Sequence, residues 1–392
     1  MGEQLLIVGA SGRAAAASAI RAGFEPFVID LFADADTKRL CPTLRCPFDD
    51  YPHGFIELAK HAPPGPWMYT GGLENHPEVV AAISQGRRLW GHEPVQFANV
   101  RDPFRLFSLL TVHAYRCAQV CPVAGIQPKG RWLTKKLNSG GGRDIRDEYL
   151  GVEHSTNSYL QEFIPGTPAS ALYVSTPWKV DLLGLSTQLI GTPWLHAKPF
   201  EYAGNFAPHP PSDADWMMME RLGWLFNQYG LKLGLFGVDY IRTDGHPVPI
   251  EVNPRYTASV EVYELACRVS VLQKHRAGVT CLDDGADRNT DWAADSELKA
   301  TRVVGKGVYY ATAPITFPAS GPWDDSLVRC ADVWRRPDYA DIPEPGALIE
   351  PGQPVLTIFA EADSEAACVA ELKRRAAGLD QLFGIPTPED GP

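Results

Sequence analysis

The stretch GVDYIRTDGHPVPIEVNPR, residues 237–255, predicts a β-hairpin that carries oxygen ligands. Two strand-like segments flank an Asp-Gly pair, which is typical of a hairpin turn. Glu251 and Asn253 stand two apart on one strand, so their side chains share a face. Asp239, on the preceding strand, can lie beside them. Three such ligands suit Mg2+, which takes few protein ligands and completes its shell with phosphate and water.

The same strand also carries a cation. Arg255 continues the face of Glu251, and its forked guanidinium can hold a phosphate or a carboxylate. Residues 248–253, VPIEVN, are largely apolar, so we expect Glu251 to be buried. A buried carboxylate without a partner is costly, and this favours a nearby cation over a merely solvated polar face.

A second motif, KKLNSGGGRDI at residues 135–145, places three glycines, Gly140, Gly141 and Gly142, after two lysines. A flexible loop of this kind offers backbone N–H groups to phosphate oxygens, and Lys135 adds a positive charge. The loop is not a Walker loop, because the pattern G-x-x-x-x-G-K-[ST] is absent. Taken alone, the glycine run fits a linker as well as a phosphate site.

A third motif, YLQEFIPG at residues 159–166, is an apolar strand that ends in Glu162, Phe163 and Ile164 before a Pro-Gly turn. The backbone edge of such a strand can hydrogen-bond an adenine ring. Taken alone, the segment is equally well a strand followed by a turn.

Together and in this order, the three motifs resemble those of the ATP-grasp superfamily, over roughly residues 96–270. The resemblance implies ATP and Mg2+ as cofactors and an ADP-forming ligation of a carboxylate to an amine. It implies that Lys135 and Gly140 to Gly142 contact the phosphates. It also implies roles for the remaining motif residues: adenine binding by Glu162, Phe163 and Ile164, magnesium binding by Asp239, Glu251 and Asn253, and stabilisation of the transferred phosphoryl group by Arg255.

The chain departs from the family pattern at one helix start. The family often has Asp-Lys there, with the lysine on a phosphate, whereas this sequence has Asp102 followed by Pro103. Arg101 or Arg105 can substitute for that lysine, and the sequence leaves both open. In the family, an acidic residue that contacts the ribose often follows the adenine-binding segment, which is here the hinge at residues 159–166. Residues 166–170, GTPAS, contain no such carboxylate.

The expected fold class is α/β: an ATP-grasp fold preceded by a Rossmann-like parallel-sheet domain and followed by a small strand-rich domain. Strand–helix alternation predicts the parallel sheet over residues 1–95. The ATP-grasp domain is expected over residues 96–272. Residues 273–392 are expected to form a linker, polar and irregular up to residue 300, and a C-terminal closing domain.

Composition argues against nucleic-acid and membrane partners, and the resemblance implies small-molecule partners, a carboxylate and an amine. The 392-residue chain has a formal charge of −11, opposite to what nucleic-acid wrapping requires. No apolar run reaches the roughly 18 residues of a membrane span, and the first residues predict a strand and turn rather than a secretory signal. Eight scattered cysteines predict reduced thiols and a cytoplasmic location. The sequence leaves the oligomeric state open, and a homo-oligomer is one of the options.

Two other functions remain open from the sequence. GASGRA at residues 9–14, with Asp30 at the end of the next strand, mimics part of a dinucleotide fingerprint and so suggests an NAD(P)-dependent oxidoreductase. The full G-x-G-x-x-G pattern is missing. A non-catalytic ATP-binding protein is the other alternative, although all three expected metal ligands are present.

Three weaker observations concern the substrates. TGGLEN at residues 70–75 brings Glu74 to a strand end, where it can meet a substrate amine or merely form a tight turn. Residues 194–210 carry His196, Lys198, Tyr202, Asn205 and His209, which either line a substrate pocket or lie in a solvated loop. Finally, residues 12–37 resemble the opening of ATP-grasp proteins encoded among one-carbon coenzyme genes, which implies a ligase of tetrahydromethanopterin- or methanofuran-type coenzyme synthesis.

Overall fold

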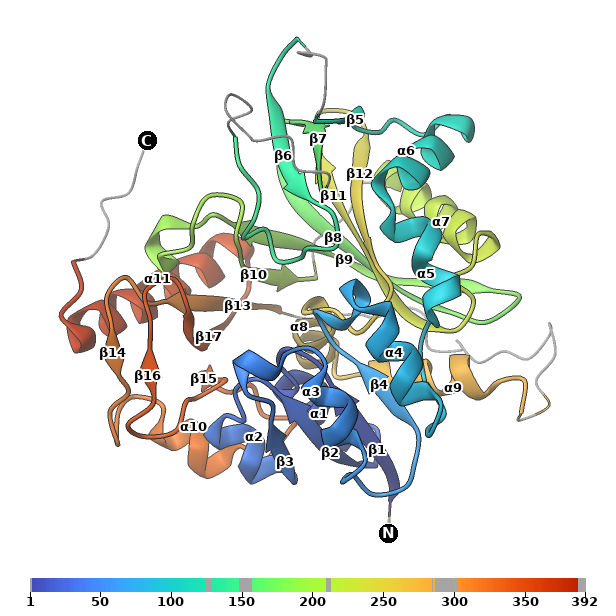
Figure 1. Ribbon diagram of the computed structural model, residues 1–392. Helices are drawn as coiled ribbons and strands as arrows, with labels where there is room; N and C mark the ends of the chain where they lie inside the picture. The colour runs from blue at the N-terminus through green and yellow to red at the C-terminus, as the bar shows by residue number, and fades with distance from the viewer. Residues whose placement is uncertain are drawn as a thin grey trace.

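The computed structural model describes residues 2–123, 129–147, 157–208, 213–283 and 302–386, with the single positions 285 and 300. Figure 1 shows the N-terminal segment below and the strands β6 and β7 at the top, with the large sheet between them. None of the described helices is long and apolar enough to cross a membrane. All eight cysteines are free thiols.

The N-terminal segment forms the predicted parallel sheet, with strand order β3-β2-β1-β4. Its strands are β1 (Glu3–Val8), β2 (Phe24–Asp30), β3 (Thr43–Arg45) and β4 (Trp67–Tyr69). The helices between and after them are α1 (Arg13–Arg21), α2 (Ala35–Leu40), α3 (Gly54–Ala59) and α4 (Pro77–Ser84). The apolar run of β1 is buried from Leu5 to Val8, as expected for a parallel strand that is covered on both faces.

Two short helices lead to a small sheet above the large one. They are α5 (Pro94–Arg101) and α6 (Pro103–Val112). Asp102 caps α6, because its side chain accepts hydrogen bonds from the amides of Phe104 and Arg105. The small sheet has the order β5-β7-β6 and consists of β5 (Val120–Pro122), β6 (Trp132–Lys136) and β7 (Ser158–Glu162).

The centre of the molecule is an eight-stranded sheet with the order β12-β11-β8-β9-β10-β13-β17-β15, and all its strand pairs are antiparallel. Its strands are β8 (Thr167–Ser175), β9 (Val180–Ile190), β10 (Tyr202–Ala207), β11 (Gly234–Arg242), β12 (Pro247–Asn253), β13 (Val303–Tyr310), β15 (Tyr339–Ala340) and β17 (Pro354–Ala362). The C-terminal segment is strand-rich as expected, and its main strands extend this sheet through the pairing of β13 with β10.

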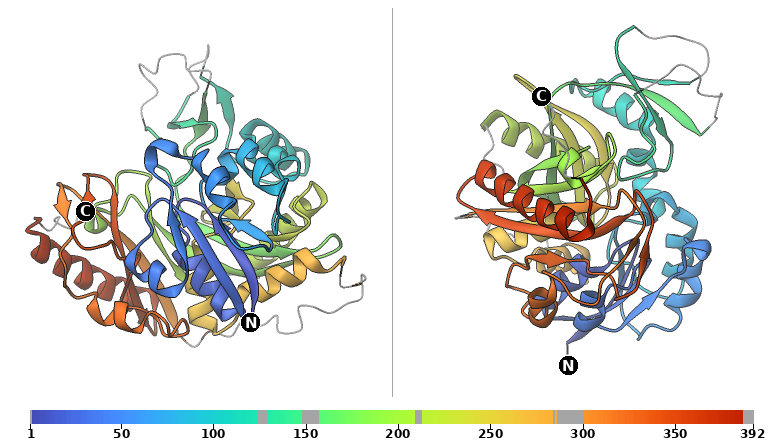
Figure 2. Two further views of the ribbon diagram at one scale, coloured as in Figure 1. Left: turned by 60° about the horizontal axis from the view of Figure 1, so that its bottom comes forward. Right: turned by 90° about the vertical axis from the view of Figure 1, so that its left-hand side faces the viewer.

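Helices cover the large sheet, as the two views of Figure 2 show. They are α7 (Asp213–Gln228), α8 (Ser259–Cys267), α9 (Val271–Thr280) and α11 (Glu365–Phe383), while α10 (Asp324–Arg329) lies nearer to α2. A two-stranded sheet joins β14 (Ile315–Thr316) to β16 (Leu348–Ile349). Since α9 runs to Thr280, the irregular segment expected from residue 273 is helical at its start, and residues 286–299 lie outside the described part of the chain. The domain limits at residues 95 and 272 stay a prediction.

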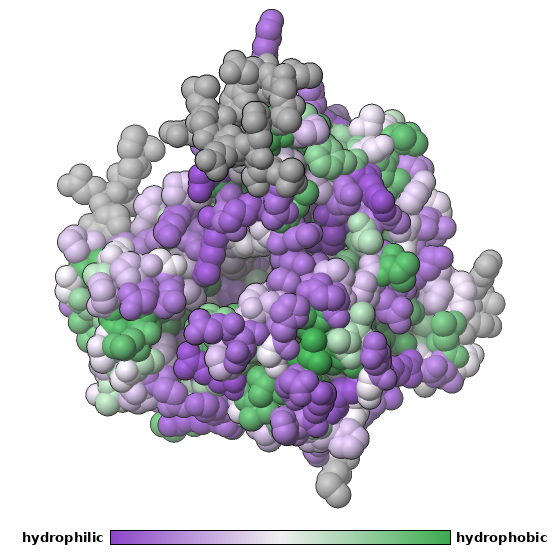
Figure 3. All heavy atoms as spheres, in the orientation of Figure 1, coloured by the Kyte–Doolittle hydropathy of each residue, from purple (hydrophilic) through white to green (hydrophobic). Residues whose placement is uncertain are grey.

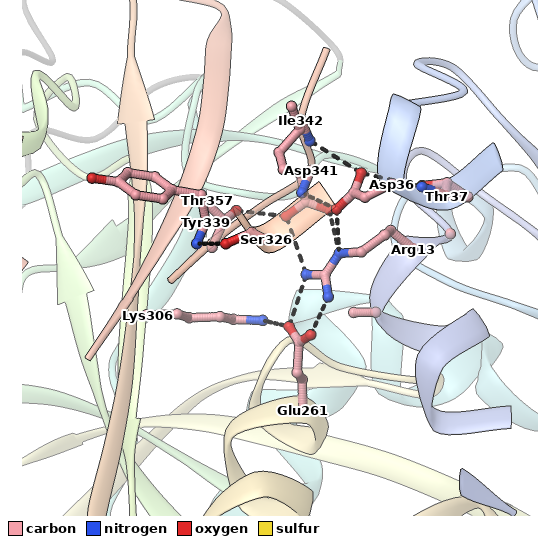
Figure 4. A network of polar contacts seen from close by, with 12 residues as sticks. Arg13, Asp36, Thr37, Glu261, Lys306, Ser326, Tyr339, Asp341, Ile342 and Thr357 are labelled. Atoms are coloured by element: carbon pink, nitrogen blue, oxygen red, sulfur yellow. Dashed lines mark hydrogen bonds and ion pairs between the residues drawn. The ribbon is translucent and has the colours of Figure 1, made fainter. Parts of the chain in front are cut away.

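A buried ionic network connects the N-terminal sheet, the large sheet and the C-terminal segment (Figure 4). Arg13, on α1, donates to Glu261 of α8 and, with an Nε–Oδ1 distance of 2.9 Å, to Asp341. Lys306 of β13 also donates to Glu261, with an Nζ–Oε2 distance of 3.1 Å. Asp36 accepts hydrogen bonds from the backbone of Asp341 and of the residue after it. Because breaking such a buried pair strands a charge, the network fixes the three segments relative to one another.

Candidate active site

A cavity of about 510 Å³ lies between the small sheet and the large sheet. Figure 3 shows a hollow near the middle of this face, bordered largely by hydrophilic residues. Ten of the eleven residues expected at the site line the cavity: Lys135, Gly141, Gly142, Glu162, Phe163, Ile164, Asp239, Glu251, Asn253 and Arg255. Gly140 lines a smaller adjoining pocket instead. The structure therefore brings together three sequence motifs that are far apart along the chain.

The hairpin of β11 and β12 sets the acidic part of the site. Asp239 stands directly opposite Glu251 in the strand register, and a β-bulge follows Asp239. Asp239 accepts one hydrogen bond from Gln188 and one from the amide of Asn253, each at 2.9 Å. Burial, with a further contribution from Glu251, raises the pKa of Asp239 to about 6. Glu251 is not buried as expected, since 34% of its side chain is exposed where the strand borders the cavity. Two neighbouring carboxylates still favour a bound cation at this position.

The donor set fits Mg2+ better than a metal held by protein ligands alone. Within the described residues, no group of three or more His, Cys, Asp or Glu side chains is arranged to hold a metal ion. The site offers the two carboxylates of Asp239 and Glu251 and the amide of Asn253. Phosphate oxygens and water would have to complete the shell, which is how Mg2+ binds in phosphoryl-transfer sites.

Arg101 reaches the same site. The sequence left open whether Arg101 or Arg105 takes the place of the family's lysine. Its guanidinium donates to Glu251 Oε1 at 2.5 Å, to Asn75 Oδ1 at 2.7 Å and to the carbonyl of Ser139 at 3.0 Å. Arg105 is exposed and bonds Asn99 instead. The structure therefore brings Arg101, and not Arg105, to the expected metal and phosphate region.

Lys135 lies on β6 and is only 8% exposed. Burial lowers the pKa of its ammonium group, while the carboxylates Glu251 and Asp239 act in the opposite direction. The glycine loop that follows is held against the large sheet. The amide of Tyr202 donates to the carbonyl of Gly141 at 3.0 Å, and Arg143 pairs with the buried Glu201. A cation and a backbone-rich loop thus border the acidic pair.

The expected adenine hinge at the end of β7 differs in one respect from the prediction. Glu162 accepts a hydrogen bond from the amide of Gln119 at 3.1 Å, which orients its carboxylate. The N–H of Phe163 donates to the carbonyl of Arg131, so this amide is already engaged by the protein. The guanidinium of Arg131 also lies 3.8 Å from the Phe163 ring centroid. Gln161, which the sequence did not single out, is buried in the cavity wall with Oε1 unbonded.

Arg255 forms an ion pair that its sequence motif does not reveal. Its Nε donates to Glu74 Oε1 at 2.7 Å, and its Nη2 donates to Asn253 at 3.1 Å. Glu74 is 3% exposed. Burial acts to raise the pKa of Glu74, but Arg255 and Arg101 together hold it below its usual value. Glu74 therefore positions Arg255, and one of its two oxygens is not available to a substrate amine.

The dinucleotide-like turn has a structural role. Asp30, which would meet a ribose in a dinucleotide fold, is fully buried. It accepts hydrogen bonds from the amides of Gly12, Phe32 and Ala33. Arg13 at the start of α1 is bound in the interdomain network. These contacts occupy the groups that dinucleotide binding would use and so disfavour an oxidoreductase.

Residues 194–210 divide between the cavity and the packing around it. Tyr202 and Asn205 line the cavity, whereas the buried His196 faces away and lies 2.7 Å from Asp380 of α11. Lys198 approaches Gly352. His209 lies outside the described residues.

Comparison with known proteins agrees with this geometry. Residues 106–259 match the family model described as an ATP-grasp domain. An uncharacterized protein of Methanocaldococcus jannaschii is 25% identical over 160 residues, which are 41% of this chain and 34% of the relative. The match thus spans about a third of that relative's length.

Solved structures resemble the chain over nearly its whole length. The L-amino acid ligase from Bacillus licheniformis has a TM-score of 0.68 at 15% identity, covering 96% of this chain and 97% of the ligase. The N5-carboxyaminoimidazole ribonucleotide synthetase from Thermus thermophilus has a TM-score of 0.64 at 15% identity, covering 98% of this chain and all of the other. The chain has the ATP-grasp fold, with a parallel sheet before it and strand-rich structure after it.

Proposed function

We propose that the protein is an ATP- and Mg2+-dependent ligase that joins a carboxylate to an amine through an acyl phosphate. One observation carries the proposal: the Asp239–Glu251 pair shares a cavity with Lys135, the glycine loop and Arg255. This combination of two carboxylates, cations and backbone amides suits a triphosphate with its metal ion.

In this mechanism the protein acts through position and charge. The end of β7 would hold the adenine of ATP, and Lys135 with the amides of Gly141 and Gly142 would bind its phosphates. Asp239, Glu251 and Asn253 would hold Mg2+, which would supply positive charge to offset that of the phosphate oxygens. Arg255 faces the group that is transferred, because Glu74 and Asn253 fix its guanidinium. Fixed cations of this kind supply much of the stabilisation that phosphoryl transfer needs.

The chemistry has two steps. A carboxylate oxygen of the acid attacks the γ phosphorus, the bond from that phosphorus to the β–γ bridging oxygen breaks, and ADP leaves. The amine nitrogen then attacks the acyl carbon, inorganic phosphate leaves, and the amine proton passes to water. No protein nucleophile takes part, which is consistent with the absence of a G-x-S-x-G motif from the sequence.

The two similar solved structures support this proposal by their names, since both are ligases or synthetases. A setting in one-carbon coenzyme synthesis is supported only by the resemblance of residues 12–37. Pterin and furan acids are therefore the first substrates to screen. A non-catalytic ATP-binding protein is disfavoured because the metal-binding groups and Arg255 are all assembled at one cavity.

The test is to incubate the protein with Mg-ATP, candidate acids and hydroxylamine, and to measure ADP, AMP and hydroxamate. We expect ADP with stoichiometric hydroxamate, because hydroxylamine replaces the amine at the acyl phosphate. Glu251→Gln should remove most turnover while leaving the melting temperature near that of the wild type. Glu57→Gln, at an exposed position of α3, is the matched control. AMP as the main nucleotide product would refute the mechanism.

A further inference from the structure

A row of polar side chains crosses the large sheet beside the expected metal site. Asp239 of β11 is opposite Ser170 of β8, which is opposite Ser186 of β9. Two residues along β9, Gln188 is opposite Asn205 of β10. Residues that are opposite in an antiparallel pair share a face of the sheet, so the row forms one continuous floor. All five residues line the cavity.

Asn205 has an unmade hydrogen bond in this floor. Its side chain is almost completely buried, with 1% exposed. Its Oδ1 accepts a hydrogen bond from the hydroxyl of Tyr202 at 2.7 Å, which orients the amide group. Its Nδ2 is buried without a partner. A buried donor of this kind is costly in an empty site and is compensated when a ligand supplies an acceptor.

The cation next to Asn205 is already neutralised. Lys306 of β13 is opposite Asn205 in the register, but its ammonium group bonds Glu261, which also holds Arg13 (Figure 4). Lys306 therefore does not provide a free charge to the cavity. A ligand at this end meets the amide of Asn205 rather than an available cation.

The members of the row other than Asp239 are uncharged. Thr257, just before α8, and Ser259, its first residue, also line the cavity, and their hydroxyls bond each other at 2.9 Å. Among the described residues, the charged groups that line the cavity are those of the hinge, the metal site and the phosphoryl site: Arg131, Lys135, Glu162, Asp239, Glu251 and Arg255. A second formal charge on the substrate would be desolvated here without a partner.

We propose that this floor is the acid subsite, and that it binds a carboxylic acid carrying an uncharged oxygen acceptor, such as an amide or carbonyl, to which Asn205 Nδ2 donates. The inference rests on the proposed function and adds the substrate class. Gln188 bonds Asp239 and pairs with Asn205, so the subsite adjoins the expected metal site. The reacting carboxylate lies toward Arg255, and the neutral group lies over β9 and β10.

Four matched acids test the substrate class: succinamate with a neutral amide, succinate with a second carboxylate, 4-aminobutyrate with an ammonium group, and butyrate with none of these. Each is incubated with Mg-ATP and hydroxylamine. The acid oxygen attacks the γ phosphorus and releases ADP, and hydroxylamine then releases phosphate and a proton to give the hydroxamate. We expect kcat/KM for succinamate to exceed that of each other acid by about tenfold, the value of one good hydrogen bond.

Two variants test the residue. Asn205→Asp keeps the shape and the acceptor for Tyr202 but replaces the Nδ2 donor by a carboxylate oxygen, so KM for succinamate should rise at least tenfold while KM for ATP stays unchanged. Asn205→Leu removes the donor without adding a charge, and the preference for succinamate over butyrate should disappear. Asn99→Asp, at an exposed position of α5, is the control. Melting temperatures check that each variant folds.

Several outcomes overturn the inference. Preference for succinate or 4-aminobutyrate contradicts the substrate class. An unchanged KM for succinamate in Asn205→Asp also contradicts it, because that result would mean that the substrate donates the hydrogen bond. No hydroxamate from any of the four acids, with Mg-ATP still raising the melting temperature, also counts against this subsite and leaves nucleotide binding intact. AMP formation, or no effect of Mg-ATP at all, would instead overturn the proposed function.

Discussion

The guanidinium of Arg101 lies 2.5 Å from the carboxylate of Glu251, although the two residues are 150 positions apart in the sequence. The same group donates to Asn75 beyond the N-terminal sheet and to the carbonyl of Ser139 at the glycine loop. One side chain thus links three segments that border the cavity. Arg101 orients the expected metal ligand and ties the loop to it.

We therefore predict that Arg101→Ala lowers Mg-ATP turnover by about 10- to 100-fold, as expected when a group that orients a metal ligand is removed. Arg101→Lys should recover only part of this loss, because an ammonium group lacks the fork that bonds Glu251 and Ser139 together. The measurement is ADP formation over a range of Mg2+ concentrations. Arg105→Ala, at an exposed position on α6, should behave as wild type. Equal activity of the two alanine variants would contradict the role of Arg101.

The Arg255–Glu74 pair predicts a separation of stability from catalysis. Arg255→Ala leaves the buried carboxylate of Glu74 without its main cation, so the free energy of unfolding should fall by about 3–5 kcal/mol. The double variant Arg255→Ala/Glu74→Gln removes that stranded charge and should recover most of the stability. It should not recover turnover, because the proposed role of Arg255 is to act on the transferred phosphoryl group.

Denaturant unfolding and steady-state kinetics on the same samples give both quantities. Turnover at saturating ATP should fall much more than ATP affinity does in both variants. Recovery of turnover in the double variant would show that Arg255 acts only through the stability of the fold. A variant that binds ATP poorly but turns over normally at saturation would contradict the proposed role equally.

The local parts of this structure could be predicted from the sequence. The hairpin and its Asp-Gly turn follow from the sequence, but that turn alone would place Asp239 opposite Ile250, and the β-bulge after Asp239 brings it opposite Glu251. The cap at Asp102 and the parallel N-terminal sheet follow from equally local patterns. Each of these depends on residues that are close together in the chain.

The contacts made by long side chains across segments could not be predicted. Arg101 and Arg105 carry the same group four positions apart, and only tertiary packing turns Arg101 toward Glu251. Nothing local to TGGLEN reveals that Glu74 pairs with Arg255. The engaged amide of Phe163 depends on pairing between distant strands. Propensity and spacing carry no information about such contacts.

Buried histidines predict that the protein becomes less stable in mild acid. Burial lowers the pKa of His275 to about 4, from an ordinary value of 6.5. The unfolded chain therefore binds a proton below pH 6.5 that the folded protein does not accept until about pH 4. The contribution of His275 to stability is complete above pH 6.5 and is lost as the pH falls toward 4.

The check is a comparison of unfolding free energies at pH 7.5 and pH 5.0. In the wild type, the amide of Leu235 donates a hydrogen bond to His275 Nδ1 at 3.0 Å. His275→Gln keeps an acceptor for this amide but removes the imidazole group that takes up a proton. The loss of stability on acidification should be about 2 kcal/mol smaller in this variant than in the wild type. His61→Gln, at an exposed position, should leave the loss unchanged. An equal loss in wild type and His275→Gln would contradict the assignment.

Two adjacent glycines predict different costs for the same substitution. Gly141 and Gly142 both have positive φ, +70° and +76°. A Cβ at Gly142 would lie 1.9 Å from the carbonyl oxygen of Phe200, whereas a Cβ at Gly141 would meet nothing within 4 Å. Alanine at either position carries the left-handed backbone cost of roughly 1–2 kcal/mol. Only alanine at Gly142 also pushes the loop away from the large sheet.

Gly142→Ala should therefore lower kcat/KM for ATP by about 100-fold, because a displacement near 1 Å at a positioned group can cost that much. Gly141→Ala should cost about tenfold, from the backbone term alone. The affinity for Mg-ADP, measured by calorimetry, should fall in the same order, since the loop is expected to contact the phosphates. Phe200 fixes this difference: its carbonyl is backbone and cannot rotate away as a side chain would. Equal losses in the two variants would mean that the loop does not close against Phe200 when nucleotide binds.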